Sequence, residues 1–116
     1  MRIGVDIEDI SRFSDKTPEK DAAFLNRIFT QKELEYCFGY KNPAPHLAAR
    51  YCAKEAVVKA VSELYDKTVS YNKIEILNNN KGAPFINIYI EDLKKYKFSV
   101  SLSHEKDKAA AFVIVE

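Results

Sequence analysis

The chain has 116 residues, with 18 lysines and arginines against 17 aspartates and glutamates and a formal net charge of +1 at pH 7. This length fits one domain over residues 1–116, and the balanced charge predicts no attraction to nucleic acid or to an anionic membrane. Hydrophobic residues make up 47% and charged residues 30%, a balance that excludes disordered and low-complexity classes.

The sequence shows neither a targeting segment nor a metal-binding or redox cysteine motif. No apolar run is long enough for a membrane span, and the opening MRIGVDIEDI has acids where a signal peptide needs an apolar stretch. We therefore expect a cytoplasmic protein. Cys37 and Cys52 show neither metal-type nor redox-type spacing, which favours reduced, packed thiols over zinc or disulfide chemistry.

The first third of the chain predicts one strand and two helices. Residues Arg2 to Ile7 alternate as in a half-buried strand. Glu19 to Ile28 has helical character, and Thr30 with Glu33 has the spacing of a capping box that opens a second short helix. In the strand we expect one row to face the core and the other to point away from it: Ile3, Val5 and Ile7 inward, Gly4 and Asp6 outward.

The remaining elements are a long helix and two hairpins. Prolines at 43 and 45 predict a break over Lys41 to Pro45, and the longest helix follows, to about Tyr65. Turn residues separate two pairs of predicted strands: Lys73–Leu77 with Phe85–Ile90, and Phe98–Leu102 with Ala109–Val115. This order predicts an α+β fold, an antiparallel sheet packed against the long central helix.

The long helix carries charges where an apolar face is expected. Arg50 and Lys54 fall within its apolar arc, and alanines cover most of the other side, so the helix is expected to be packed nearly all round. One interpretation is structural: the cations extend along apolar surface, and Glu55 pairs with Lys59. The other is functional, because three cations and one carboxylate at these spacings suit a phosphate held with a metal. The apolar arc consists of Leu47, Tyr51, Val57, Val58, Val61, Leu64 and Tyr65.

Two further residues allow alternative interpretations. Asp6 fits a second metal ligand beside Glu55, because magnesium is usually held by one or two carboxylates plus phosphates and waters; it equally fits an exposed residue on an edge strand. His104 follows serines 99, 101 and 103 on one strand face, but nothing resembles a nucleophile elbow. There is no glycine-rich phosphate loop or dinucleotide fingerprint either.

Four blocks in order resemble the holo-acyl-carrier-protein synthase family of phosphopantetheinyl transferases. They span nearly the whole chain, and the first and third are jointly specific. The resemblance implies transfer of the 4'-phosphopantetheine group of coenzyme A to a serine of an apo acyl carrier protein, with release of adenosine 3',5'-bisphosphate. The blocks are Gly4 to Phe13, Arg27 to Thr30 with Glu33, Ala49 to Ala60, and Val100 to His104.

The resemblance also implies roles for individual residues. Asp6 and Glu55 match the family's magnesium ligands, and either Glu55 or a metal-associated water accepts the serine proton. Three cations and one histidine match positions that contact coenzyme A: Arg50, Lys54, Lys59 and His104. Lys59, like Asp6 and Glu55, is also expected to be catalytic. Two basic residues match positions facing the acidic carrier protein, Arg12 and Arg27. Short members of the family form homotrimers with shared sites, so we expect a homotrimer here.

The chain departs from the family at one segment. Relatives carry a Gly-Thr-Gly type segment soon after the position of Ala60, whereas this chain reads Val61 to Thr68 and has no glycine between Gly39 and Gly82. This departure motivates the alternative of a non-catalytic or weakly active carrier-protein-binding homologue. A generic α+β interaction domain is a third possibility, but it leaves the charges of the long helix without an account.

Overall fold

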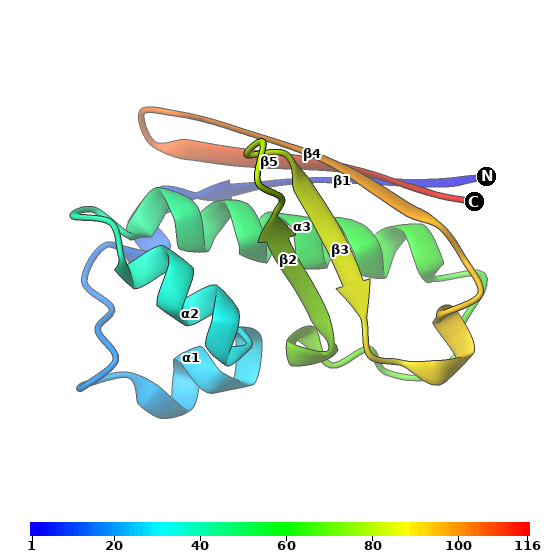
Figure 1. Ribbon diagram of the computed structural model, residues 1–116, viewed down its shortest axis with the longest axis horizontal. Coiled ribbons are helices and arrows are strands. Elements are labelled where there is room, and N and C mark those ends of the chain that lie inside the picture. Colours follow the sequence, from blue (N-terminus) through cyan, green and yellow to red (C-terminus); the bar gives the residue numbers. More distant parts are fainter.

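The computed structural model describes all 116 residues, arranged as antiparallel strands packed on a long helix (Figure 1). The predicted α+β fold is therefore confirmed. The helices are α1 (Ala22–Ile28), α2 (Gln31–Phe38) and α3 (Ala44–Val61), and the strands are β1 (Arg2–Asp9), β2 (Ile74–Asn78), β3 (Pro84–Ile88), β4 (Phe98–Glu105) and β5 (Lys108–Val115). None of the helices is both long and apolar enough to cross a bilayer.

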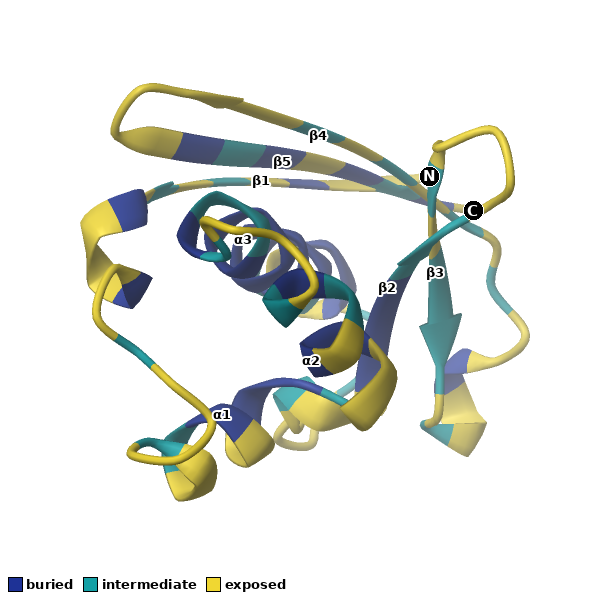
Figure 2. Cartoon of the chain, turned by 60° about the vertical axis from the view of Figure 1, so that its left-hand side comes forward, coloured by how far each residue is buried: buried dark blue, intermediate teal, exposed yellow.

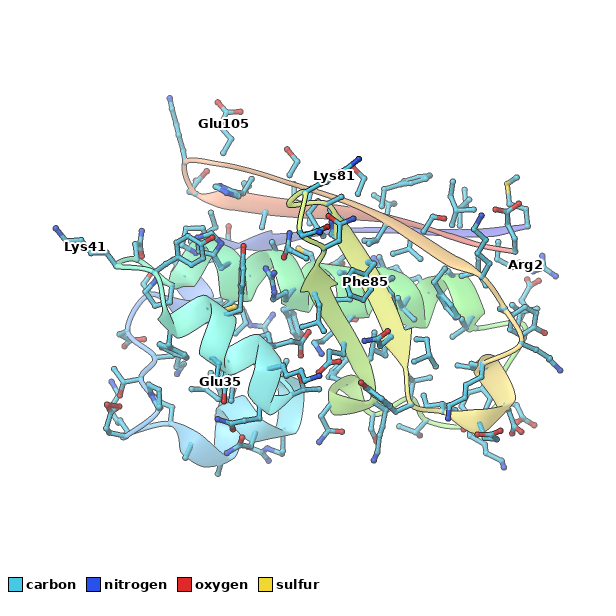
Figure 3. The ribbon with its side chains drawn as sticks, in the orientation of Figure 1. Arg2, Glu35, Lys41, Lys81, Phe85 and Glu105 are labelled. Carbon is cyan, nitrogen blue, oxygen red and sulfur yellow. The ribbon has the colours of Figure 1, made fainter.

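The strands form two antiparallel sheets. One has the order β1-β5-β4, and the other is the β2-β3 hairpin. Both predicted hairpins are thus present, and their charged tips, marked by Lys81 and Glu105, project into solvent (Figure 3). The turn between β2 and β3 places Gly82 at φ +84°, a left-handed backbone that glycine adopts without strain. The chain termini lie together at one end of the larger sheet (Figure 1).

Helix α3 is the centre of the core. It is enclosed between the larger sheet and the segments of α1, α2 and β2, and its ribbon is buried over most of its length (Figure 2). The prediction that it packs nearly all round is confirmed, since Leu47 on one side and the alanines of the other side are all buried, with at most 4% of their surface exposed: Ala49, Ala53, Ala56 and Ala60. Both cysteines are buried and unpaired.

Three predicted helix boundaries need adjustment. The first helix starts at Ala22, not Glu19, and α3 ends at Val61, where Leu64 and Tyr65 both donate to the Val61 carbonyl in a closing turn. The start of α3 lies inside the predicted break, at Ala44. A proline in the first helical turn sacrifices no hydrogen bond, because that N–H has no partner in the helix.

The expected orientation of β1 is wrong. The row predicted to face the core is exposed, with Ile3, Val5 and Ile7 showing 60%, 58% and 63% of their surface to solvent. The opposite row, Gly4 and Asp6, faces α3 instead. The reason is the distance between the two elements: a Cβ on Gly4 would lie 1.9 Å from the Ala56 carbonyl oxygen, so only glycine lets β1 approach this helix.

Candidate active site

Asp6 lies where β1 passes over the C-terminal half of α3. The close approach at Gly4 brings the strand onto the helix backbone at Ala56 and Ala60, and Asp6 follows two residues later on the same face. Lys59 donates from Nζ to Asp6 Oδ1 at 3.1 Å and to the Val5 carbonyl at 3.0 Å. Lys59 therefore pairs with Asp6, and the alternative pairing of Glu55 with Lys59 is not formed.

Glu55 is held by two tyrosines. The hydroxyls of Tyr51 and Tyr71 both donate to Glu55 Oε1, each at 2.8 Å. Burial, then the hydrogen bond and charge of Glu55, raise the pKa of Tyr51 to about 12, and the same causes raise the pKa of Tyr71. Both phenols therefore keep their protons near neutral pH and act as donors.

Each of the two carboxylates has one oxygen atom that accepts no hydrogen bond. Asp6 Oδ2 is buried and has no hydrogen-bond partner, while both hydrogen bonds to Glu55 reach Oε1 and leave Oε2 free. An unpartnered buried carboxylate oxygen is costly unless a ligand completes it. This donor set fits magnesium, which takes hard oxygen ligands and often uses one or two protein carboxylates. No group of three or more His, Cys, Asp or Glu side chains is gathered for a metal.

Lys54 is placed differently from the prediction that it contacts coenzyme A. Its side chain is fully buried, and its ammonium group donates to Glu33 Oε1 at 2.8 Å, to the Tyr71 carbonyl at 2.9 Å and to the Ile74 carbonyl. All three donors of the ammonium group are used inside the protein. We therefore remove Lys54 from the candidate site and assign it to the core.

Arg50 lies in an aromatic cluster at the other end of the helix. The residue is only 3% exposed. Its guanidinium group donates to Asn78 and lies over the Tyr36 ring at 4.2 Å, while its buried Nε has no partner. His46 stacks on Tyr40 at 3.8 Å between ring centres. Burial, followed by the charges of Arg50 and His104, lowers the pKa of His46.

His104 completes this cluster from β4. Its ring centre lies 6.2 Å from that of His46, so the predicted nucleotide-end residues Arg50 and His104 are brought into one region. Asp6 with its partner Lys59, and Glu55 one helical turn before Lys59, form a second region farther along α3. The structure thus separates the candidate site into a carboxylate end and an aromatic, cationic end.

Arg12 and Arg27 are exposed on the side of the molecule that carries the first helices. Arg12 pairs with Glu8 at 3.0 Å and lies over the Tyr51 ring at 4.9 Å, and Arg27 lies in the last turn of α1. Burial and the nearby Asp6 raise the pKa of Glu8, although Arg12 opposes this shift. Arg12 therefore adjoins the carboxylate end of the site.

The comparisons with known proteins agree with the resemblance. The sequence model of the 4'-phosphopantetheinyl transferase superfamily matches residues 2–113. The chain belongs to this superfamily. A holo-[acyl-carrier-protein] synthase of Thermodesulfovibrio yellowstonii is 43% identical over 97% of this chain and 96% of its own. One from Aquifex aeolicus is 40% identical over 98% and 97%.

Solved structures show the same fold for this phosphopantetheinyl transferase. A holo-[acyl-carrier-protein] synthase of Helicobacter pylori, in complex with coenzyme A, has a TM-score of 0.83 at 29% identity, covering 98% of this chain and 99% of its own. The Neisseria meningitidis enzyme has a TM-score of 0.82 at 33% identity, covering 99% and 97%. The resemblance drawn from four sequence blocks is confirmed.

Several residues around the candidate site were not predicted from the sequence. Tyr71 is a neighbour of Glu55 that no local pattern indicates, because it lies 16 positions away. Tyr51 could have been found, since it stands one helical turn before Glu55. Likewise His46 precedes Arg50 by one turn, and its carbonyl accepts a hydrogen bond from that arginine.

Proposed function

We propose that this protein is a holo-acyl-carrier-protein synthase. It transfers 4'-phosphopantetheine from coenzyme A to a serine hydroxyl of an apo acyl carrier protein, depends on Mg²⁺ and releases adenosine 3',5'-bisphosphate. The observation that carries the proposal is the pair of half-satisfied carboxylates, Asp6 with its orphaned buried Oδ2 and Glu55 with its free Oε2.

The protein's own groups suit such a transfer. Phosphoryl transfer is mainly a problem of positioning and charge stabilisation, and the bound metal supplies part of the positive charge at the phosphates. Lys59 offers a second cation beside Asp6, and its side chain is 55% exposed and so accessible to a phosphate. We keep Arg50 and His104 as the proposed partners of the phosphates at the nucleotide end, because the buried Nε of Arg50, unlike the ammonium group of Lys54, has no partner within the protein. Glu55 or a water accepts the serine proton.

Two surface features support the remaining parts of the proposal. Arg12 and Arg27 offer cations to an acidic carrier, which mainly raises the association rate. The exposed apolar row of β1, together with Phe112 on β5, supports a symmetric oligomer, since monomers rarely expose such a contiguous patch. We propose a cytoplasmic homotrimer in which His104 acts across the interface.

The decisive experiment is mass spectrometry of an apo carrier protein incubated with this protein, coenzyme A and Mg²⁺. We expect a gain of one phosphopantetheine that chelation prevents. Asp6→Asn and Glu55→Gln should each lower the rate by about 100-fold or more, as for loss of a charge-stabilising group, without changing the melting temperature. Glu91→Gln, an exposed acid paired with Lys94, is the matched control. An unmodified carrier would favour the alternative of a carrier-binding homologue, motivated by the glycine-free segment after Ala60.

The oligomer has its own test. Light scattering should report a trimer, and mixing inactive Asp6→Ala and His104→Ala variants under subunit exchange should restore some transfer, because some mixed interfaces contain one intact site. A fully active monomer would refute the shared site. Failure to complement within a proven trimer would place His104 in the same subunit as the carboxylates.

A further inference from the structure

The carboxylate of Glu55 receives two hydrogen bonds on a single oxygen. Tyr51 and Tyr71 both donate to Oε1 at 2.8 Å, with their rings 5.6 Å apart and inclined at 61°. The donors come from separate parts of the chain, one on α3 and the other in a 3-10 helix at Tyr71–Lys73 that precedes β2. Two donors fixed on separate elements restrict the rotation of the carboxylate between them.

Tyr51 is held firmly on the side of α3. Only 7% of its surface is exposed, and its ring packs against Phe13 with centres 5.7 Å apart. The guanidinium group of Arg12 covers the ring at 4.9 Å. Because Tyr51 precedes Glu55 by four residues, its hydroxyl reaches the carboxylate along the helix surface. The donor is therefore positioned before any ligand binds.

Tyr71 is anchored by the buried lysine. The ammonium group of Lys54 donates to the Tyr71 carbonyl at 2.9 Å while it pairs with Glu33. The backbone of Tyr71 is thus tied to the core, and its hydroxyl extends to Glu55, the residue next to Lys54. Tyr71 therefore links the buried ion pair of Lys54 and Glu33 to the carboxylate of Glu55.

From this geometry we propose that Tyr51 and Tyr71 are positioning residues that hold Glu55 Oε1 and so direct Oε2 to the metal. The inference rests on the proposed function, in which Glu55 is a magnesium ligand. Hydrogen-bonded partners of metal ligands orient them, and their loss commonly weakens metal affinity by about 10- to 100-fold. The pair acts through Glu55 and does not touch the substrate.

The test compares Tyr51→Phe, Tyr71→Phe and the double variant with the unchanged protein. Binding of Mn²⁺ in the presence of coenzyme A, followed by electron paramagnetic resonance of the free ion, gives a readout independent of transfer. We expect the double variant to bind Mn²⁺ about 10- to 100-fold more weakly, with each single variant in between. The Mg²⁺ concentration for half-maximal transfer should rise in parallel, while kcat recovers at saturating Mg²⁺.

Tyr89→Phe is the matched control, because the Tyr89 hydroxyl also donates to a carboxylate at 2.8 Å, that of Glu75, away from the site. It should leave the metal dependence unchanged. The inference is overturned if the double variant keeps the metal affinity of the unchanged protein, or if it loses rate equally at all metal concentrations. Glu55→Gln separates the two claims: if that variant keeps full metal-dependent transfer, the proposed metal site itself fails.

Discussion

On α3, the side chain of Lys54 points into the interior, toward Glu33 of α2 and the backbone at the start of β2. The side chain of Glu55 reaches a partly buried position between Tyr51 and Tyr71. Every hydrogen of the lysine ammonium group has a partner within the protein. The carboxylate of Glu55, in contrast, has one oxygen saturated and one open. Two adjacent charged residues therefore differ in whether the fold alone satisfies them, and only the open one is available to a ligand.

The largest effect should come from breaking the buried ion pair of Lys54 and Glu33. Lys54→Met leaves the fully buried carboxylate of Glu33 unpaired, and removal of one partner from a buried ion pair costs about 3–5 kcal/mol. We expect this loss in the free energy of unfolding, measured by urea denaturation. Lys59→Met, which removes a 55% exposed lysine from its pair with Asp6, should cost about 1 kcal/mol or less. Similar losses for both lysines would remove the distinction between the two regions.

The partners of Glu33 illustrate which contacts the sequence predicts and which it does not. The capping box of Thr30 and Glu33 is local, and it is present as predicted. The same Glu33 also accepts hydrogen bonds from Lys54 and from the Ile76 backbone. Partners 21 and 43 residues away have no periodic signature, so Lys54 could not be separated from Arg50 and Lys59 by spacing.

The orientation of β1 shows a second limit. An alternating pattern predicts that one row is buried but not what buries it. Here the apolar row lies on the surface of the chain, and the row of Gly4 and Asp6 contacts α3. The hairpins, the long helix and the family blocks were predictable because each depends on neighbouring residues.

The close contact of β1 with α3 offers the next test. Gly4→Ala puts a methyl group against the Ala56 carbonyl, a backbone atom that cannot move aside cheaply. We expect a loss of about 1–3 kcal/mol in unfolding free energy, as for an overpacked core, and slower transfer because Asp6 moves away from α3. Gly39→Ala, where a Cβ would lie 3.3 Å from its nearest neighbour, is the control. A Gly4→Ala variant as stable and active as the unchanged protein would contradict the described packing.

The cations of the candidate site should differ in which of the two substrates they bind. Lys59→Ala and Arg50→Ala are expected to raise KM for coenzyme A by about tenfold or more, because charge-assisted contacts contribute about 1.5–3 kcal/mol. Arg12→Ala and Arg27→Ala should raise KM for the carrier protein instead. Steady-state kinetics with each substrate varied in turn measures both, and an equal loss toward both substrates in all four variants would argue against the division.

Substitution of Glu75 should give the smallest change in stability. It tests a buried carboxylate that is held by hydrogen bonds and has no ion pair. Burial acts to raise its pKa, but hydrogen bonds from Thr30, Tyr89 and Asn87 outweigh burial and hold the pKa below its usual range. A lowered pKa in the folded state means that the ionised form stabilises the fold above the unfolded pKa of about 4.3. This contribution is lost as the pH falls through the folded value.

We therefore expect Glu75→Gln to be less stable than the unchanged protein at pH 7, by on the order of 1 kcal/mol, and the difference to shrink as the pH falls below about 4. Urea denaturation across this range measures it. Glu91→Gln, at an exposed acid, should show no such convergence. If the Glu75→Gln difference persisted unchanged at acid pH, the side chain would stabilise the fold by its packing. The hydrogen bonds to the ionised carboxylate of Glu75 would then not be the source of that stability.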